Sequence, residues 1–250
     1  MLEISDHGAI RQIRLNRPPA NAINHELVRA LIRELAEAEN AADAVVISGA
    51  PGMFSAGLDV PELLTLDREE LFSFWQEFTR LLGRIARMPV PIVFALTGHA
   101  PAGGIVLAVF GDYRVMANGS FKTGVNEVQV GLVVPPQVYQ ALVRLIGPRR
   151  AERITVAGEM MEAQHAFDIG LVDELADDPD DAVARSIAWC ERHLALPRRA
   201  MSESRAMARA DIRSWFEGNG KLQPGDFTAG WFEAETQQTL KALVERLKSR

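Results

Sequence analysis

Residues 92–116 are IVFALTGHAPAGGIVLAVFGDYRVM, and this stretch decides the fold class of the chain. Ile92–Leu96 is a short apolar run typical of a buried strand, and Gly98–Gly104 predicts a sharp turn into an apolar helix near Ile105–Phe110. Tyr113–Met116 is the next strand candidate. A strand, a helix and another strand in this order indicate an α/β protein with mostly parallel strand pairing.

The chain before this stretch carries similar signals. Leu2–Leu15 alternates between apolar and polar residues around a turn, which predicts a hairpin, and Asn24 is an N-cap candidate for a helix to about residue 35. Ala44–Ser48 predicts another buried strand, and residues 68–87 have helical spacing. The apolar residues expected on one face of that helix are Phe72, Trp75, Phe78, Leu82 and Ile85.

The last quarter of the chain is different in character. From about Leu196 onward the pattern is helical and strand-free, with breaks at Gly218-Asn219-Gly220 and Pro224-Gly225. We therefore divide the chain into an α/β core over residues 1–195 and a helical C-terminal region over residues 196–250. Because this region has more large apolar surface than isolated helices can bury, it should pack on the core or on another subunit. The residues that supply this surface are Trp215, Phe216, Phe227, Trp231 and Phe232.

The composition of the chain argues against several functional classes. Its 250 residues, 48% hydrophobic and 24% charged, are ordinary for a globular protein. A net charge of −6 argues against general nucleic-acid binding, which needs a basic face. No apolar run reaches the roughly 18 residues of a membrane span, and the first residues lack the order of a signal peptide. We expect a cytoplasmic protein with no nucleic-acid or membrane partner.

Several chemical motifs are absent from the sequence. There is no G-x-S-x-G elbow, no phosphate-binding P-loop and no G-x-G-x-x-G turn, and the histidines lack metal-ligand spacing. The single cysteine, Cys190, is expected to be a packed thiol, and the acidic run Asp177–Asp181 a turn or a helix start. We therefore expect neither a metal nor a redox cofactor.

Two glycine-bearing turns remain, Gly-Leu-Asp at 57–59 and Pro-Ala-Gly-Gly at 101–104, each between a strand signal and a helix signal. Backbone N–H groups at such turns lack intrahelical partners and favour negative charge, so each turn can bind an oxyanion. Taken alone, each turn is more simply explained by the backbone freedom of glycine. Glu127, within Gly124–Gly131, is the only strong acid–base candidate in the same part of the chain.

Taken together, four segments resemble the crotonase (enoyl-CoA hydratase/isomerase) superfamily, in the family's order and over roughly residues 10–175. They are Leu15-Asn16-Arg17-Pro18 with Asn21-Ala22-Ile23-Asn24, Phe54-Ser55-Ala56-Gly57-Leu58-Asp59, Gly98–Gly104, and Asp112-Tyr113-Arg114 followed by Asn126-Glu127 and Gly131-Leu132. Within the superfamily the chain most resembles the mitochondrial-type Δ3,Δ2-enoyl-CoA isomerases. The resemblance implies a spiral of strand-strand-helix turns, an acyl-CoA thioester substrate, and a homotrimer or dimer of trimers built with the helical tail.

The resemblance also implies which residues form the site. It places the two oxyanion-hole donors at the N–H groups of Leu58 and Gly103, where they would polarise the thioester carbonyl and stabilise an enolate. An alternative role for Asp59, just after the first turn, is to cap a helix. Contacts with CoA are implied near Ala20, Ala22, Ala56, Asp59 and Val60.

Glu127 and Val106 together indicate the reaction. The family pattern gives hydratases two glutamates, of which one aligns with Glu127, whereas the second position holds Val106. A valine cannot transfer protons, but isomerisation needs only one carboxylate, which takes a proton from C2 and returns it at C4. Apolar surroundings should raise the pKa of Glu127 toward the working pH. The substrate pocket would also include Leu132 and Asn126, which either orients the carboxylate or holds the loop.

We therefore expect an enoyl-CoA isomerase that moves a double bond from the 3,4 to the 2,3 position through an enolate. Within the superfamily, the alternatives are hydratase, hydrolase or lyase activity on a CoA thioester. Outside the enzymes, the alternative is an acyl-CoA-binding protein that retains the fold without catalysis.

Overall fold

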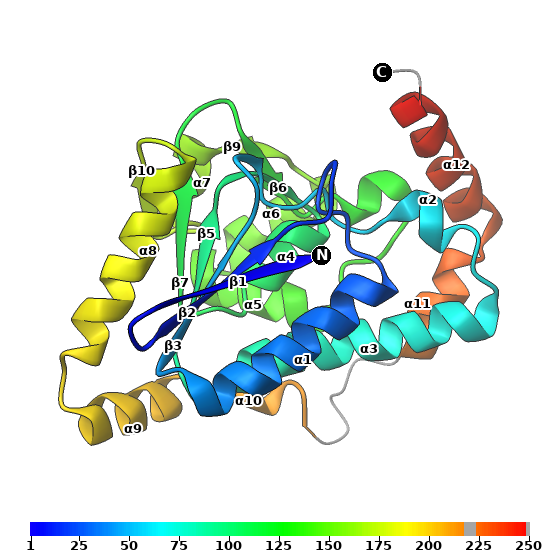
Figure 1. Ribbon diagram of the computed structural model, residues 1–250. Helices are drawn as coiled ribbons and strands as arrows, with labels where there is room; N and C mark the ends of the chain where they lie inside the picture. The colour runs from blue at the N-terminus through cyan, green and yellow to red at the C-terminus, as the bar shows by residue number, and fades with distance from the viewer. Residues whose placement is uncertain (218–223, 249–250) are drawn as a thin grey trace.

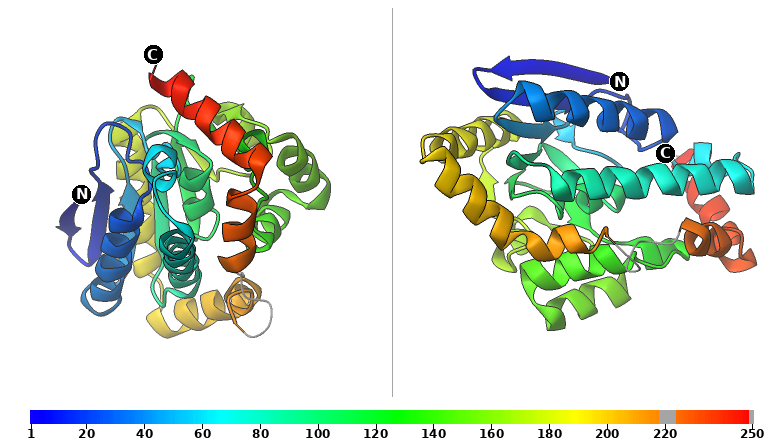
Figure 2. Two further views of the ribbon diagram at one scale, coloured as in Figure 1. Left: turned by 90° about the vertical axis from the view of Figure 1, so that its right-hand side faces the viewer. Right: turned by 90° about the horizontal axis from the view of Figure 1, so that it is seen from below.

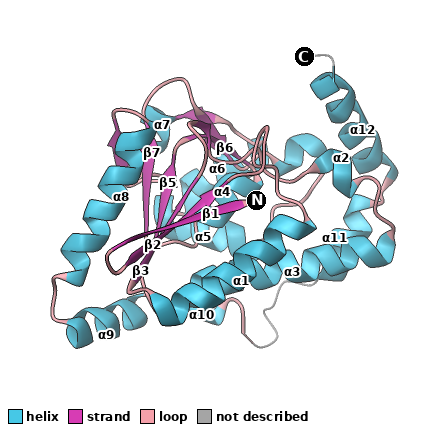
Figure 3. Ribbon diagram, in the orientation of Figure 1, coloured by secondary structure: helices cyan, strands magenta, loops and turns pink. Residues whose placement is uncertain are grey.

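The structure is a computed structural model that describes residues 1–217 and 224–248 of the chain (Figure 1). Its centre is a six-stranded sheet in the order β1-β2-β3-β5-β7-β10. β1 (Leu2–His7) and β2 (Ile10–Leu15) form the predicted antiparallel hairpin, and the remaining pairings of this sheet are parallel. The strands are surrounded by helices, as Figure 3 shows, so the predicted α/β class is confirmed.

Three inner strands of this sheet are buried on both faces. They are β3 (Ala44–Ser48), β5 (Ile92–Leu96) and β7 (Tyr113–Ala117), and β10 (Glu174–Ala176) forms the edge next to β7. Because side chains alternate along a strand, Val45 and Val46 enter two different hydrophobic clusters on opposite faces. This burial on both faces explains why these strands are continuous apolar runs in the sequence.

A second, four-stranded sheet has the order β4-β6-β8-β9. β4 (Gly52–Met53), β6 (Gly98–Pro101) and β8 (Lys122–Gly124) each follow a strand of the large sheet, and β9 (Met161–Glu162) pairs antiparallel with β8. The chain therefore repeats a strand in one sheet, a strand in the other sheet and a helical segment, which is the predicted spiral. The stretch from Gly98, predicted as a turn, begins as strand β6.

Two long helices cover one face of the large sheet and lie side by side (Figure 2). α1 (His25–Ala41) begins at the predicted N-cap, where Asn24 Oδ1 accepts a hydrogen bond from Leu27 N at 2.9 Å. α3 (Arg68–Arg87) buries Phe74 but leaves Phe72 37% exposed. The expected place of Phe72 on the buried face is therefore wrong, because the apolar stripe passes through position 74 instead.

α8 (Pro179–Leu194) covers the opposite face of the sheet (Figure 1). Asp178 caps its N-terminus, so the acidic run is a helix start as predicted, and no group of acidic, histidine and cysteine residues in the described ranges is arranged to hold a metal ion. Cys190 belongs to α8 and is fully buried, and burial raises the pKa of its thiol to about 12. The prediction of a packed, unreactive thiol is consistent with this environment.

The remaining helices of the core connect these layers. They are α2 (Val60–Leu63), α4 (Gly103–Ala108), the 3-10 helix η1 (Glu127–Val130), α5 (Pro136–Ile146), α6 (Pro148–Ala157) and α7 (Ala163–Asp168). No helix in the described part of the chain is both long and apolar enough to cross a lipid bilayer.

The C-terminal region is helical throughout its described residues and folds back onto the core (Figure 2). It comprises α9 (Arg198–Ala208), α10 (Ala210–Ser214), α11 (Pro224–Trp231) and α12 (Ala234–Lys248). α11 packs on α3, where Trp231 is fully buried and its ring centroid lies 6.3 Å from that of Trp75. The apolar tail was predicted to pack on the core or on another subunit, and in the structure it packs on the core. The predicted break at Gly218–Gly220 lies outside the described residues, and the division at residue 195 stays a prediction.

Candidate active site

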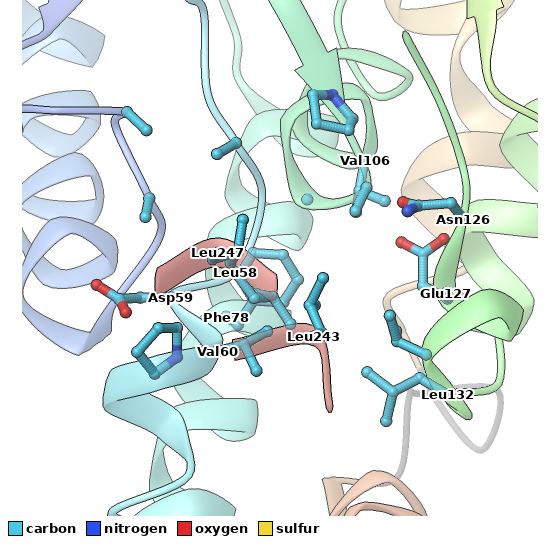
Figure 4. Close-up of a pocket in the computed structure, with 18 of the residues that line it drawn as sticks. Leu58, Asp59, Val60, Phe78, Val106, Asn126, Glu127, Leu132, Leu243 and Leu247 are labelled. Atoms are coloured by element: carbon cyan, nitrogen blue, oxygen red, sulfur yellow. The ribbon is translucent and has the colours of Figure 1, made fainter. Parts of the chain in front are cut away.

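A cavity of about 490 Å³ lies between the two glycine-bearing turns, η1 and the C-terminal helices (Figure 4). Every residue that the sequence analysis nominated for a site lines this one cavity. They are Ala20, Ala22, Ala56, Leu58, Asp59, Val60, Gly103, Val106, Asn126, Glu127 and Leu132. The structure therefore brings together segments that lie more than a hundred residues apart in the chain.

The first turn presents the N–H group of Leu58. A parallel bridge joins Leu58 to Ile23, in which Ile23 N donates to Gly57 O at 2.7 Å and Asp59 N donates to Ile23 O at 2.9 Å. The residues on either side of Leu58 make these bonds, so the Leu58 N–H has no backbone acceptor within the described residues. Gly57 has a φ of 86°, a conformation that favours glycine.

The second turn presents the N–H group of Gly103, the first residue of α4. An N–H in the first turn of a helix has no intrahelical partner. The preceding residue, Ala102, has a φ of 44° and a ψ of −121°, which is strained for a residue with a side chain and costs on the order of 1–3 kcal/mol. A hydrogen bond of 2.8 Å from Ala102 N to Gly124 O holds it there. The strained backbone thus sets the direction of the free N–H.

The two turns meet backbone to backbone. A Cβ placed on Gly57 would lie 3.1 Å from the Gly103 nitrogen, and a Cβ on Gly103 would lie 3.3 Å from the Leu58 nitrogen. A side chain at either glycine would therefore push the two N–H groups apart. Two free backbone donors side by side on a cavity wall have the arrangement of an oxyanion hole.

Asp59 is occupied by structural contacts. Its Oδ1 accepts a hydrogen bond from Glu62 N at 3.1 Å and caps α2, so the alternative role as a helix cap is confirmed. Its Oδ2 lies 2.7 Å from Arg17 Nη2, which also contacts Glu62 Oε2 at 3.0 Å. Arg17 lines the cavity too, and the sequence analysis did not assign it a place there.

Glu127 is the first residue of η1, and its position is fixed by contacts of its neighbours. Leu132 N donates to Glu127 O at 3.0 Å, and Gln129 Nε2 donates to Gly158 O at 2.8 Å. The residue is half-buried, but its carboxyl atom Oε2 is buried without a hydrogen-bond partner within the described residues. Burial raises the pKa of this carboxyl group to about 7, only partly opposed by a hydrogen bond to its own backbone N–H.

Asn126 and Val106 lie beside this carboxyl group. Figure 4 shows the Asn126 and Glu127 side chains entering the cavity from the same side, with Val106 next to them. Asn126 Oδ1 is also buried and without a hydrogen-bond partner in the described part of the chain. Val106 is 2% exposed and adds only an apolar surface. The raised pKa of Glu127 follows from these surroundings, because no charged neighbour contributes to it.

The C-terminal helices complete the cavity, which the sequence analysis did not predict. Phe227 of α11 packs against Trp75 of α3, with ring centroids 5.5 Å apart. Leu243 and Leu247 of α12 line the cavity together with Leu58 and Phe78, all of which are labelled in Figure 4. The large apolar side chains of the tail were the only sequence signal for this contact. Their spacing alone does not tell which surface of the core they cover.

Comparisons with known proteins agree with this geometry. The sequence profile of the family described as enoyl-CoA hydratase/isomerase matches residues 5–250. A probable enoyl-CoA hydratase, EchA17, of Mycobacterium tuberculosis is 32% identical over 205 residues, covering 81% of this chain and 77% of the relative. The human mitochondrial enoyl-CoA delta isomerase 1 is 28% identical over 249 residues, covering 97% and 82%.

Solved structures give the same result. The crystal structure of human mitochondrial delta3-delta2-enoyl-CoA isomerase superposes with a TM-score of 0.93 at 26% identity, covering 99% of this chain and 98% of that one. An enoyl-CoA hydratase/isomerase from Mycobacterium paratuberculosis superposes with a TM-score of 0.87, also at 26% identity, covering 96% and 97%. These matches confirm the resemblance to the isomerase branch that the motifs predicted. The chain belongs to the enoyl-CoA hydratase/isomerase family of the crotonase superfamily.

Proposed function

We propose that this enzyme is an enoyl-CoA isomerase that converts a 3-enoyl-CoA into a 2-enoyl-CoA. Relatives named as hydratases and relatives named as isomerases both match the chain, so the choice between the reactions rests on the site. The observation that carries the proposal is that the cavity offers one available carboxyl group. Asp59 is held by Arg17 and by the cap of α2. Among the described residues of the cavity wall, Glu127 therefore has the one available carboxyl group.

The reaction begins with the removal of a proton. The Glu127 carboxylate takes a proton from C2 of the 3-enoyl-CoA, and the electron pair of that C–H bond moves onto the thioester carbonyl oxygen. The N–H groups of Leu58 and Gly103 stabilise the resulting oxyanion, an effect of about 3–4 kcal/mol per donor in comparable sites. The intermediate is a dienolate with its charge spread between the oxygen, C2 and C4.

The second half of the reaction returns the same proton. Protonated Glu127 delivers it to C4, the electrons reform the thioester carbonyl, and the double bond now lies between C2 and C3. A group that is first a base and then an acid works best with a pKa near the operating pH. The pKa of about 7 at Glu127 suits both steps.

Hydration requires more groups than this cavity supplies. Adding water to C2 and C3 needs one group that takes a proton from the water and one that protonates C2. In the family pattern the second group stands at the position of Val106, whose buried side chain does neither. The apolar contact at Val106 therefore favours isomerisation over hydration.

The substrate and assembly expected from the sequence belong to the same proposal. We assign the CoA part of the thioester to the wall of the cavity formed by Ala20, Ala22, Ala56, Asp59 and Val60. No additional cofactor takes part, and the enzyme acts in the cytoplasm as a homotrimer or dimer of trimers. Exposed apolar side chains on neighbouring elements, Val128 of η1 and Val156 of α6, support assembly.

Product analysis tests the proposal directly. Purified protein is incubated separately with a 3-enoyl-CoA and a 2-enoyl-CoA, and the products are analysed by mass spectrometry for water uptake and by NMR for the position of the double bond. The expected result is conversion of the 3-enoyl-CoA with little 3-hydroxyacyl-CoA. Binding of both thioesters without turnover would support the non-catalytic alternative, and hydration as the main reaction would support a hydratase.

A further inference from the structure

The far end of the oxyanion helix α4 is held by the C-terminal region. Arg209, between α9 and α10, donates from Nη2 to Phe110 O at 2.6 Å and from Nη1 to Gly111 O at 3.1 Å. Phe110 and Gly111 form the turn that follows α4, and Arg209 itself is 7% exposed. Buried carbonyl groups that lack a donor are costly. The tail thus donates a hydrogen bond to each of the two carbonyl groups in the turn at the end of the helix that begins with Gly103.

A buried carboxylate anchors the same guanidinium group. Asp112 Oδ1 lies 3.4 Å from Arg209 Nη1, and both oxygens of Asp112 accept hydrogen bonds of 2.8 Å from Arg205. Asp112 also accepts a bond of 2.8 Å from Ile92 N at the start of β5. Burial works to raise the pKa of Asp112, but Arg205 and Arg209 hold it below its ordinary value. The aspartate is therefore charged, and it ties the tail to the core at this turn.

The turn after α4 is also held from the core side. Arg114 of β7 donates from Nη1 to Ala108 O at 3.4 Å and to Gly111 O at 3.3 Å. The Phe110 ring packs edge to face against Phe216 of the tail, with centroids 5.3 Å apart. The end of α4 is therefore fixed between strand β7 and the C-terminal region.

Because α4 is short, the position of its C-terminal end affects its N-terminal end, where Gly103 lies. The helix has six residues, so Phe110 lies only about 10 Å along the axis from Gly103. A strained residue such as Ala102 keeps its conformation only where the surrounding structure determines it. β8 holds Ala102 at one end through Gly124 O, and the contacts of Arg209 hold the other end.

We propose that Arg209 is a positioning residue for the oxyanion site. By holding the turn after α4, it fixes the direction of the Gly103 N–H and therefore the degree to which the thioester carbonyl is polarised. This inference rests on the proposed function, because it needs a thioester carbonyl between Leu58 and Gly103. The C-terminal region then has two separate roles. α11 and α12 line the cavity, and Arg209, between α9 and α10, positions the oxyanion site.

The test measures polarisation of the carbonyl without requiring turnover. A saturated acyl-CoA with a carbon-13 label at the thioester carbonyl is bound to the full-length protein, and the carbonyl stretch is recorded by isotope-edited infrared spectroscopy. The parent protein should shift the stretch to lower frequency. R209M removes the Arg209 hydrogen bonds to Phe110 O and Gly111 O and leaves Arg114 as the remaining donor to Gly111 O, so its shift should be smaller. Its kcat for a 3-enoyl-CoA should fall about tenfold, with KM changed less than about twofold.

Arg205 provides the matched control. R205M removes a buried partner of Asp112 and the contacts with the carbonyl groups of Met88 and Pro89, but it leaves the Arg209 hydrogen bonds to Phe110 O and Gly111 O in place. Both variants should unfold at lower temperature than the parent, whereas the carbonyl shift should decrease only in R209M. An undiminished shift in R209M, or an equal decrease in both variants, would overturn the role of Arg209.

Two further outcomes are separated by this design. If R209M does not fold, R209K takes its place. Lysine keeps the positive charge, but its single ammonium group cannot reproduce the two fixed donors with which the planar guanidinium of Arg209 reaches both carbonyl groups. Its shift should be smaller than that of the parent, and an equal shift would count against the inference. If the parent itself shows no carbonyl shift, the oxyanion site is absent, and both the proposed function and this inference fail.

Discussion

Val106 and Glu127 line the same cavity from α4 and η1, and Val106 is an almost fully buried apolar neighbour of a carboxyl group whose pKa is about 7. Among the residues that the structure describes, the cavity has one available proton-transfer group where the hydratase pattern has two. Both the proposed reaction and its expected pH dependence rest on this arrangement.

Because Asp59 is held by Arg17 and by the cap of α2, the described part of the cavity wall has no second available carboxyl group, which predicts little hydration. With 2-enoyl-CoA in isotope-labelled water, the parent should give almost no labelled 3-hydroxyacyl-CoA. Val106→Glu is the single change most suited to introduce hydration, but the gain should be small because a new buried carboxylate costs several kcal/mol. The parent is the decisive case. Efficient label incorporation, at a rate similar to double-bond migration, would show that another residue supplies the second group and that the isomerase assignment is wrong.

Removal of the Glu127 carboxylate should abolish most of the turnover. Glu127→Gln is nearly the same size but cannot accept the C2 proton, so kcat should fall by about 10²–10⁴-fold while acyl-CoA binding stays largely intact. Kinetics with a 3-enoyl-CoA and titration with a saturated acyl-CoA measure the two effects. The exposed Glu235 supplies a control, since Glu235→Gln should leave both unchanged. Parent-like activity in Glu127→Gln would remove Glu127 from its role.

The pH profile should report the buried carboxyl group. Only the carboxylate form of Glu127 takes the C2 proton, so kcat/KM for 3-enoyl-CoA should rise with pH and level off above a midpoint near 7. Initial rates from pH 5 to 9 measure the curve. A midpoint close to the ordinary glutamate value of 4.5 would mean that the carboxyl group is hydrated in the free enzyme.

The same pKa predicts a cost in stability at neutral pH. The folded protein holds the Glu127 proton more tightly than the unfolded chain, so stability is lost as the pH rises from about 4.5 through about 7. The shift corresponds to about 3 kcal/mol above that window. Glu127→Gln should therefore be more stable than the parent at pH 8 but nearly equal at pH 4.5. Denaturant unfolding at both pH values measures the difference, and equal stabilities at pH 8 would contradict the burial argument.

Removal of the tail should affect assembly, stability and the cavity. Truncation after Pro197 deletes Phe227, Leu243 and Leu247 from the cavity wall and exposes the apolar surface of α3 beneath α11. The product should be a smaller and less stable species. Light scattering and thermal unfolding compare it with the full-length chain, which is expected to be a trimer or dimer of trimers. A monomeric full-length protein at micromolar concentration would count against the predicted assembly.

Local sequence signals predicted those parts of the fold that depend on neighbouring residues. Asn24 marks a helix start because its side chain caps the next turn, and Ala44–Ser48 is apolar because both faces of the strand are buried. The nominated site residues lie within turns and short motifs, so aligning the motifs also placed the residues in one cavity. Their catalytic roles stay predictions.

Features that depend on distant partners were not predicted. β6 was missed because Gly98-His99-Ala100-Pro101 has no apolar alternation and becomes a strand only by pairing with β4 and β8. The position of Phe72 was wrong because α3 has apolar residues at both 72 and 74, and the partner surface decides which is buried. The contact of Phe227 with Trp75 joins residues so far apart that spacing carries no information about it.

The tail's contribution to the cavity has a consequence for how this enzyme can change. The proposed proton-transfer and oxyanion groups lie between residues 58 and 127, whereas Phe227, Leu243 and Leu247 come from α11 and α12. Mutations that enlarge or narrow this part of the cavity can accumulate in these two helices while Glu127 stays fixed. A duplicated copy of this protein can therefore acquire a cavity of different shape while the proposed proton-transfer group is kept.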